Sequence, residues 1–246
     1  MLAFITLPLL ALFLRTSPAS LLANLRQPAA LQAIGVSLRT TLIATAVIVV
    51  FGTPIALYLA QPKTRTSRIV DTLIDLPSVL PPAVAGIALL VVFGRRGLLG
   101  NLLTDLGIQI AFTQVAVILA QVFIASPFYI KSAALGFAAV SSEIQQAAAL
   151  DGANGWQVVR FIIVPLSWPA LVSGSLMSWA RALGEFGATI IFAGNFPGRT
   201  QTMPLAIYIG FEVDLDVALA LSVILIGFSF LVLMLVKGVF HRDMAV

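Results

Sequence analysis

The chain has 246 residues, of which 60% are hydrophobic and 10% are charged, and its formal net charge is +4. Soluble domains carry about 25% charged residues, so this composition predicts an integral membrane protein. The absence of cysteine excludes disulfides, thiolate metal sites and thiol catalysis. Several basic residues lie beside apolar stretches, where they set membrane orientation, so the positive charge does not imply a nucleic-acid partner.

The first quarter of the chain predicts two membrane helices separated by an outer connection. Residues 1–14 are apolar but lack the basic front and the cleavage site of a signal peptide, so we expect a first membrane helix. Residues 16–32 form a polar connection, which makes residues 1–33 one N-terminal segment. Ile34–Ala60 is long enough to span a bilayer with some tilt. The positive-inside rule places the next loop in the cytoplasm, because it contains Lys63, Arg65 and Arg68.

The next apolar stretch, Asp71–Phe93, contains its own interruption. Pro77, Pro81 and Pro82 are expected to kink or break the helix, because proline lacks the amide N–H and clashes with the preceding turn. Irregular backbone at membrane depth is tolerated where protein or a water-filled path surrounds it. Asp75 precedes these prolines. It is either a residue of such a path or a helix cap at the interface, since acidic residues favour helix starts.

Three further stretches complete a predicted set of about six transmembrane helices in an all-α fold. They are Ala111–Ile130, with Lys131 marking its inner end, Leu166–Ala193 and Val217–Val236. In this topology both termini are cytoplasmic, residues 34–240 form the transmembrane domain and residues 241–246 form a cytoplasmic tail. His241, the only histidine, lies in that tail, where we expect a solvated side chain rather than a metal ligand.

A polar segment, residues 141–160, separates the fourth and fifth predicted spans. Alanines and glutamines favour a short helix within it, and Gly152 suits the left-handed residue that ends such a helix. A helix of about nine residues would cover only about 14 Å, less than half of the hydrocarbon core. It must therefore lie outside the hydrocarbon and face a partner. Two residue pairs have the spacing of a capping box: Ser142 with Gln145, and Asn154 with Gln157.

The fifth predicted span contains two ionisable residues. Arg181 lies near the middle of the apolar stretch, where a charge is costly unless it is paired or faces water. Glu185 would lie one helical turn further on, so the two side chains could pair. A stripe of Gly174, Ser178 and Ala182 would let another helix approach closely. The charged pair either serves packing alone or lies at a translocation path or its gate. We favour the path, because ionisable residues within membranes are usually functional.

The polar segment resembles the cytoplasmic loop of ABC importer permeases. That loop has Glu-Ala-Ala, three residues, Gly, nine residues and then Ile-x-Leu-Pro. Here Gln146-Ala147-Ala148, Gly152 and Ile162-x-Val164-Pro165 keep every spacing, with Gln146 in place of Glu and Val164 in place of Leu. An ordinary capped linker helix is the alternative. The resemblance implies a coupling helix that docks in a groove of an ATPase through Gln146, Ala147, Ala148, Asp151, Gly152 and Ala153.

Other segments resemble the oxyanion branch of these permeases. The run Ala182-Leu183-Gly184-Glu185-Phe186-Gly187-Ala188-Thr189 is similar to molybdate and sulfate permeases, and the run from Ala193 to Thr202 is more similar to the molybdate type. The resemblance covers roughly Ser37 to Lys237. It implies the type I ABC importer permease fold and import of molybdate, with tungstate as a second candidate, across the cytoplasmic membrane of a bacterium or archaeon.

The resemblance also implies partners. They are a second permease subunit, expected to be an identical copy, two copies of an ATPase subunit, and a periplasmic or lipid-anchored oxyanion-binding protein. The sequence itself indicates that ATP binds elsewhere, because a P-loop needs Gly-Lys-Ser/Thr at its end and the three lysines follow Pro62, Ile130 and Val236. We therefore expect no cofactor and no catalytic or metal site on this chain. ATP and magnesium would bind to the ATPase.

Three alternative functions remain. A sulfate or thiosulfate permease would have the same architecture with a different anion. A secondary transporter or channel would work without ATP and would fit the discontinuous third span, but no convincing internal repeat is visible. An intramembrane enzyme ranks last, because the chain has neither cysteine nor a Gly-x-Ser-x-Gly elbow and its one histidine lies in the tail.

Overall fold

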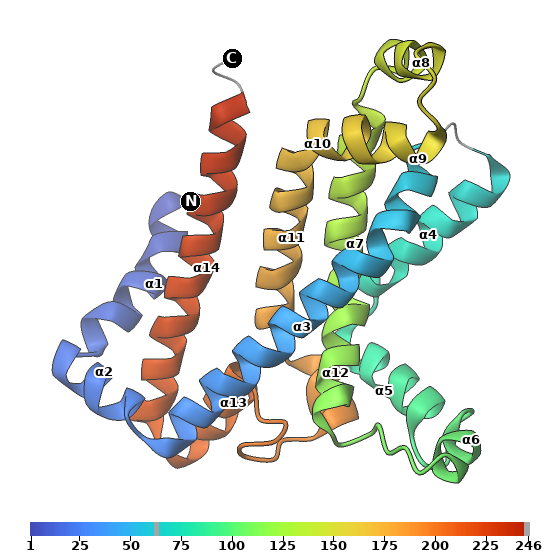
Figure 1. The fold of residues 1–246 in the computed structure, drawn as a ribbon. Helices are drawn as coiled ribbons and strands as arrows, with labels where there is room; N and C mark the ends of the chain where they lie inside the picture. Colours follow the sequence, from blue (N-terminus) through green and yellow to red (C-terminus); the bar gives the residue numbers. More distant parts are fainter. Residues whose placement is uncertain (62–63, 244–246) are drawn as a thin grey trace. The chain divides into compact units, whose positions relative to one another are not determined.

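The computed structural model describes residues 1–61 and 64–243, and these residues form helices joined by turns, without a β-strand among them (Figure 1). Lys63 of the predicted cytoplasmic loop and the last three residues of the predicted tail lie outside this described part. By their contacts the residues form two compact units. Unit 1 contains Met1–Ile43, Pro81–Gln121 and Leu183–Leu231; unit 2 contains Ala44–Leu80, Val122–Ala182 and Val232–Val246.

The N-terminal region is helical almost throughout: α1 covers Leu2–Arg15, α2 covers Pro18–Leu25 and α3 covers Pro28–Leu59. The predicted polar connection over residues 16–32 is thus itself mostly helical. Pro18 and Pro28 begin helices, because the amide N–H that proline lacks would have no helical partner at that position. The 14 residues of α1 rise about 21 Å, which is less than the thickness of a bilayer core.

Three helices are long and apolar enough to cross a membrane: α3, α7 (Gln114–Ala138) and α14 (Leu215–Asp243). The number rises to five if each of two broken helix pairs is one span. These counts apply to the described residues, and they agree with a multi-pass membrane protein. Helix α7 continues beyond the predicted end at Ile130, so Lys131 lies inside the helix rather than at its inner end.

The third predicted span is broken, as the prolines predicted. Helix α4 covers Arg65–Val79 and α5 covers Pro82–Phe93. Leu80 has extended backbone angles, which is the conformation that a following proline imposes. Pro82 begins α5, and the carbonyl of Pro81 accepts the N–H groups of Val84 and Ala85 at 2.9 and 3.2 Å. The prediction of a broken helix is therefore confirmed, and the carbonyl of Pro81 starts the hydrogen bonding of the first turn of α5.

The fifth predicted span, Leu166–Ala193, is broken as well. It consists of α11 (Trp168–Leu183) and α12 (Gly187–Ala193), so the expectation of one continuous helix is wrong. Short helical segments precede α11: α9 (Gly155–Val158), the π-helix η1 (Val159–Ile163) and α10 (Val164–Leu166). Together they form a helix that is bent by 71° against α11. Helix α12 packs on α5 within unit 1 at two glycines, Gly86 and Gly187, where a Cβ atom would lie under 3.0 Å from the other helix.

The remaining helices are short. They are α6 (Gly100–Asp105), α8 (Ser142–Leu150) and α13 (Met203–Val213). Helix α13 begins against α3 in unit 1, because the N–H of Met203 donates to Ser37 Oγ at 2.7 Å. Figure 1 shows α8 beyond the end of α7.

The core of unit 2 is built on a close antiparallel pair, α7 and α11. The stripe of small residues that the sequence predicted is confirmed, and α7 is the helix that approaches it. A Cβ atom at Gly174 would lie 2.7 Å from Ser132 Cβ, and one at Gly136 would lie 2.4 Å from Ala170 Cβ. Serine hydroxyls donate across the pair to backbone carbonyls: Ser178 to Ala125 at 3.0 Å, Ser132 to Ala170 at 2.8 Å and Ser167 to Gly136 at 3.0 Å.

Helix α3 packs on the other side of α7 in the same core. Tyr129 Oη and Thr53 Oγ1 form a hydrogen bond of 2.6 Å, and Tyr129 is among the largest buried side chains. A Cβ atom at Gly52 would lie 3.0 Å from the side chains of Tyr129 and Ile130. Small residues and internal hydroxyls thus replace large apolar side chains at these contacts, as is typical of helices packed in a membrane.

This packing predicts the effect of enlarging Gly174. Gly174→Val should destabilise the protein by about 1–3 kcal/mol, because the added methyl groups force α11 away from α7. Gly227→Ala is the matched control, since nothing lies within 4 Å of a Cβ atom there. Thermal unfolding of the detergent-solubilised chain measures both. Equal midpoints for the two variants would show that the α7–α11 contact is not tight.

Candidate functional site

Helix α8 begins one residue earlier than its sequence predicted. Ser141 is the N-cap, and its Oγ accepts the N–H of Glu143 at 3.1 Å. The predicted capping box of Ser142 with Gln145 is therefore wrong. Gln145 instead donates from Nε2 to the carbonyl of Val140 at 3.1 Å, which holds α8 to the end of the chain segment that leaves α7.

Helix α8 ends as predicted at Gly152, which has a left-handed φ of 90°. The N–H of Gly152 donates to the carbonyl of Ala149 at 3.1 Å, and the N–H of Ala153 donates to that of Ala148 at 3.0 Å. This pair of bonds is a Schellman motif, which satisfies carbonyls that a helix end would leave free. The second predicted capping box is confirmed, because Asn154 and Gln157 exchange side-chain to backbone hydrogen bonds of 3.0 and 2.8 Å.

The surface of α8 is almost entirely exposed. None of its residues is buried, and apolar side chains point into solvent: Leu150 is 89% exposed, and Trp156 of the following helix α9 is 69% exposed. Of the residues that the resemblance assigned to ATPase contact, Ala148 and Ala153 are half-buried and the others are exposed: Gln146, Ala147, Asp151 and Gly152. A contiguous exposed apolar surface is a common feature of interaction sites, which makes α8 the candidate for one.

A groove of about 720 Å³ lies behind α8 in unit 2. Its walls come from the ends of α3 and α7, from α8 itself and from the segment Gly155–Ile163. Gln145 and Gln146 line it from the α8 side and Phe137 from the α7 side. Helix α8 is therefore attached at its two ends and is not packed along its length against the membrane helices.

Unit 2 also contains an ion triad that joins α4 to α7. Lys131 Nζ donates to Asp71 and to Asp75, the latter at 2.9 Å. The three side chains are between a third and a half exposed. Asp71 and Asp75 are four residues apart and so share one face of α4. Lys131 lies two turns before the end of α7, so the triad fixes α4 to the helix that leads into α8.

The triad settles the position of Asp75 and reveals a partner that the sequence analysis missed. Asp75 lies inside α4, so it is not a cap at a helix start. The sequence pattern identifies Lys131 only as the end of a span and does not single out Asp71. The signal was present in the four-residue spacing of the two acids beside a lysine in another span. Which two spans pack together depends on tertiary structure, however, and cannot be inferred from a local sequence pattern.

Arg181 and Glu185 do not share a helical face. Helix α11 ends at Leu183, and Glu185 lies in the break before α12. The predicted geometry of two residues one turn apart on a continuous helix is therefore wrong. Glu185 is 1% exposed, and its Oε1 accepts the N–H of Ala188 at 2.9 Å at the start of α12. Arg181 is half-buried in the last turn of α11.

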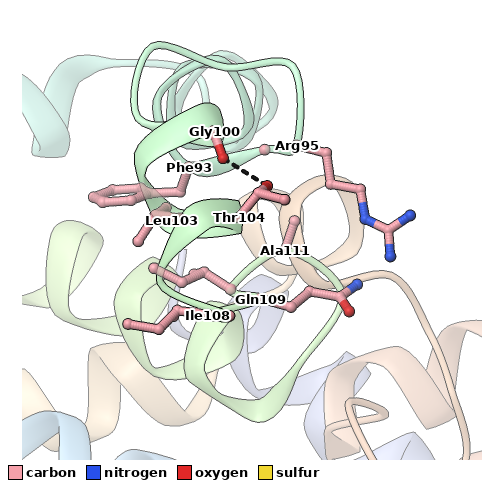
Figure 2. A pocket seen from close by; sticks show the side chains of 11 residues that line it. Phe93, Arg95, Gly100, Leu103, Thr104, Ile108, Gln109 and Ala111 are labelled. Atoms are coloured by element: carbon pink, nitrogen blue, oxygen red, sulfur yellow. Dashed lines mark hydrogen bonds between the residues drawn. The ribbon is translucent and has the colours of Figure 1, made fainter.

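A second cavity, of about 330 Å³, lies in unit 1 beside α6. Figure 2 shows apolar side chains along its walls, with Phe93, Leu103 and Ile108 among them, and the Arg95 side chain extending outward from it. Thr104 Oγ1 donates to the carbonyl of Gly100 at 2.7 Å, so this hydroxyl is occupied within the loop (Figure 2). Arg95 is the one charged residue among those that line the cavity, and its guanidinium extends away from the apolar walls (Figure 2).

Comparison with known proteins identifies close relatives. Residues 52–244 match the family described as binding-protein-dependent transport system inner membrane component. The molybdenum transport system permease protein ModB of Mycobacterium bovis is 41% identical over 231 residues, which cover 94% of this chain and 88% of the relative. A probable sulfate transport system permease protein, cysT of Chlorokybus atmophyticus, is 36% identical over 182 residues, which cover 74% of this chain and 64% of the relative.

A solved structure has the same fold. It is a bacterial alginate ABC transporter in complex with an alginate pentasaccharide-bound periplasmic protein. One of its chains matches with a TM-score of 0.69 and 16% identity, over 98% of this chain and 89% of that one. The prediction of an all-helical importer-permease fold is therefore confirmed.

The triad predicts how stability responds to its removal. Lys131→Met should destabilise the chain by about 1 kcal/mol, a value that is small because the three groups are partly exposed to solvent. The loss leaves two carboxylates facing each other on α4. The triple variant with Asp71→Asn and Asp75→Asn should recover part of this loss, because it removes that repulsion. Thermal unfolding of the solubilised chain gives both values, and a triple variant no more stable than Lys131→Met would contradict the role of the triad.

Proposed function

Because the chain belongs to the family of binding-protein-dependent transport system inner membrane components, we propose that it is the permease of an ATP-driven importer of molybdate. The observation that carries this proposal is the 41% identity, over 94% of the chain, to a molybdenum transport permease. A permease provides the route across the membrane but does not hydrolyse ATP, so the energy for transport against a gradient has to come from a partner.

Helix α8 is the surface on which we propose that this partner acts. Its exposed apolar residues, including Leu150, are costly in water and would be covered by docking. Gln146 stands where the related loops carry Glu, so the contact would rest on hydrogen bonding and shape rather than on an ion pair. The Ser141 cap and the Schellman end hold α8 in one conformation before docking, which lowers the entropy lost on binding. A push on α8 would reach α7 directly, because only three residues separate the two helices.

The partner would be an ATPase that binds ATP and magnesium, since this chain has no Gly-Lys-Ser/Thr sequence to cradle phosphates. We propose an assembly of two such ATPase subunits with two copies of this permease in the cytoplasmic membrane of a bacterium or archaeon. A periplasmic or lipid-anchored binding protein would deliver the anion. The related alginate transporter, in complex with its periplasmic protein, supports this last part of the proposal.

We assign Arg181, Glu185 and Asp75 to the translocation path or its gate. Asp75 and Asp71 are held by Lys131, so two carboxylates carry a net charge of only −1 together with the lysine. The carboxylate of Glu185 is bound to a backbone N–H. Pairing of this kind reduces the repulsion that bare carboxylates would exert on a doubly charged anion, and Arg181 would attract it.

Sulfate is the second candidate substrate, because a probable sulfate permease is 36% identical to the chain. The experiment that decides is ATP hydrolysis by the natively co-purified complex in liposomes, with its binding protein loaded in turn with molybdate, tungstate and sulfate. Stimulation by molybdate or tungstate alone supports the proposal. Stimulation by sulfate would keep the mechanism and change the substrate. If no ATPase co-purifies with the chain, the proposal fails and an ATP-independent transporter takes its place.

A change at Gly152 tests the coupling role of α8. Gly152→Val should reduce co-purification of the ATPase about tenfold, because a β-branched residue resists the left-handed backbone by about 1–2 kcal/mol. Gly152→Asn is the matched control, since asparagine adopts this conformation readily and nothing lies within 4 Å of a Cβ atom there. Membrane insertion should be unchanged in both. Equal ATPase recovery with the two variants would refute the coupling role.

A further inference from the structure

Helix α4 has an exposed face whose polarity changes along its length. Two arginines, Arg65 and Arg68, occupy the first turn of this face. Apolar residues follow them: Ile69 and Leu73 are 55% and 57% exposed, and Leu76 and Val79 are exposed as well. The spacing of 69, 73 and 76 places these side chains in one stripe along the helix. A cavity of about 310 Å³ lies where the two halves of the face meet, lined by Arg65, Arg68, Ile69, Thr72 and Leu73.

The rest of α4 fixes the direction of this face. Asp71 and Asp75 are bound to Lys131 of α7, and Ser67 and Pro77 are buried. The helix therefore cannot turn its apolar stripe inward without breaking the triad. Its start is held too, because Thr64 and Ser67 form a capping box. The arginine face and the stripe that follows it thus point away from the protein of unit 2.

The arginines favour an anionic or aqueous environment, whereas the apolar stripe favours an apolar one. Among the described residues, neither Arg65 nor Arg68 forms a salt bridge, so two guanidinium groups are available to an outside anion. The stripe that begins in the next turn would cost free energy if exposed to water, but it is favourably placed in the hydrocarbon of a membrane. A surface that is cationic at one end and apolar directly beyond it matches a phospholipid, whose phosphate sits at the interface above its acyl chains.

We propose that this cavity on α4 binds the headgroup phosphate of an anionic phospholipid, with one acyl chain along Ile69, Leu73 and Leu76. Guanidinium groups suit the phosphate because they present paired N–H donors to its oxygens. The basic loop before α4 places the site in the cytoplasmic leaflet, where basic segments meet anionic headgroups. An acidic patch on a protein partner would satisfy the arginines but not the apolar stripe, so the lipid is favoured.

The lipid site gives α4 a second attachment. The triad holds one side of the helix to α7, and the lipid would hold the other side to the membrane surface. The site depends only on the chain lying in a membrane and not on the substrate or the ATPase. It can therefore be tested without either of them, and its failure would leave the proposed transport function untouched.

The test is native mass spectrometry of the full chain in detergent, with phosphatidylglycerol or phosphatidylcholine added. Wild-type protein should retain phosphatidylglycerol in preference to phosphatidylcholine. R65Q/R68Q should bind phosphatidylglycerol about 30-fold more weakly, as about 1 kcal/mol for each arginine predicts. R26Q/R199Q, which removes the same charge from the predicted outer side, should bind as the wild type does. R65K/R68K should retain most of the preference, because the positive charge remains.

Several results would overturn the proposal. Equal retention of the two lipids by the wild type would do so without any variant, which covers the case in which R65Q/R68Q fails to fold. Displacement of phosphatidylglycerol by an equal concentration of glycerol phosphate would show a site for free phosphate instead of lipid. If R65Q/R68Q keeps its lipid preference but loses the co-purified ATPase, the arginines belong to a protein interface.

Discussion

The close approach of α7 and α11 is the contact on which the part of the chain that presents α8 depends. Glycines at 136 and 174 leave no room for a larger residue, and serine hydroxyls bind backbone carbonyls across the gap. Such contacts gain from packing and from internal hydrogen bonds rather than from expulsion of water, because lipid is as apolar as the side chains. The pair therefore forms a rigid stalk, and α8 is carried at its end.

The tight packing of α7 and α11 contrasts with the exposure of α8. The stalk is packed with small residues, whereas α8 is joined to it only through its capped ends and stands over a groove of about 720 Å³. A helix that buries none of its own residues gains little from packing against the rest of the fold. Its exposed apolar residues are those that the proposed ATPase would cover. The ion triad attaches α4 to the same pair, so that contacts link α4, α7 and α11.

The sequence predicted local features far better than contacts between helices. The breaks at the prolines, the left-handed Gly152 and the capping box at Asn154 follow from the chemistry of single residues and were confirmed. The break at 184–186 was missed, because the apolar composition of residues 166–193 is that of one long span. The pairing of Lys131 with two acids was missed for another reason. It depends on which helices lie side by side, and a single sequence does not contain that information.

The charges of the chain suit the passage of an anion in a way that composition alone does not show. Each carboxylate that we assign to the path is occupied: Asp75 by Lys131, and Glu185 by a backbone N–H. An acid bound in this way still shapes the protein but repels a passing anion less than a bare one would. Arg65 and Arg68, in contrast, lie at the exposed start of α4 and form no salt bridge with another described residue. The distribution separates groups that hold the structure from groups left available to ligands.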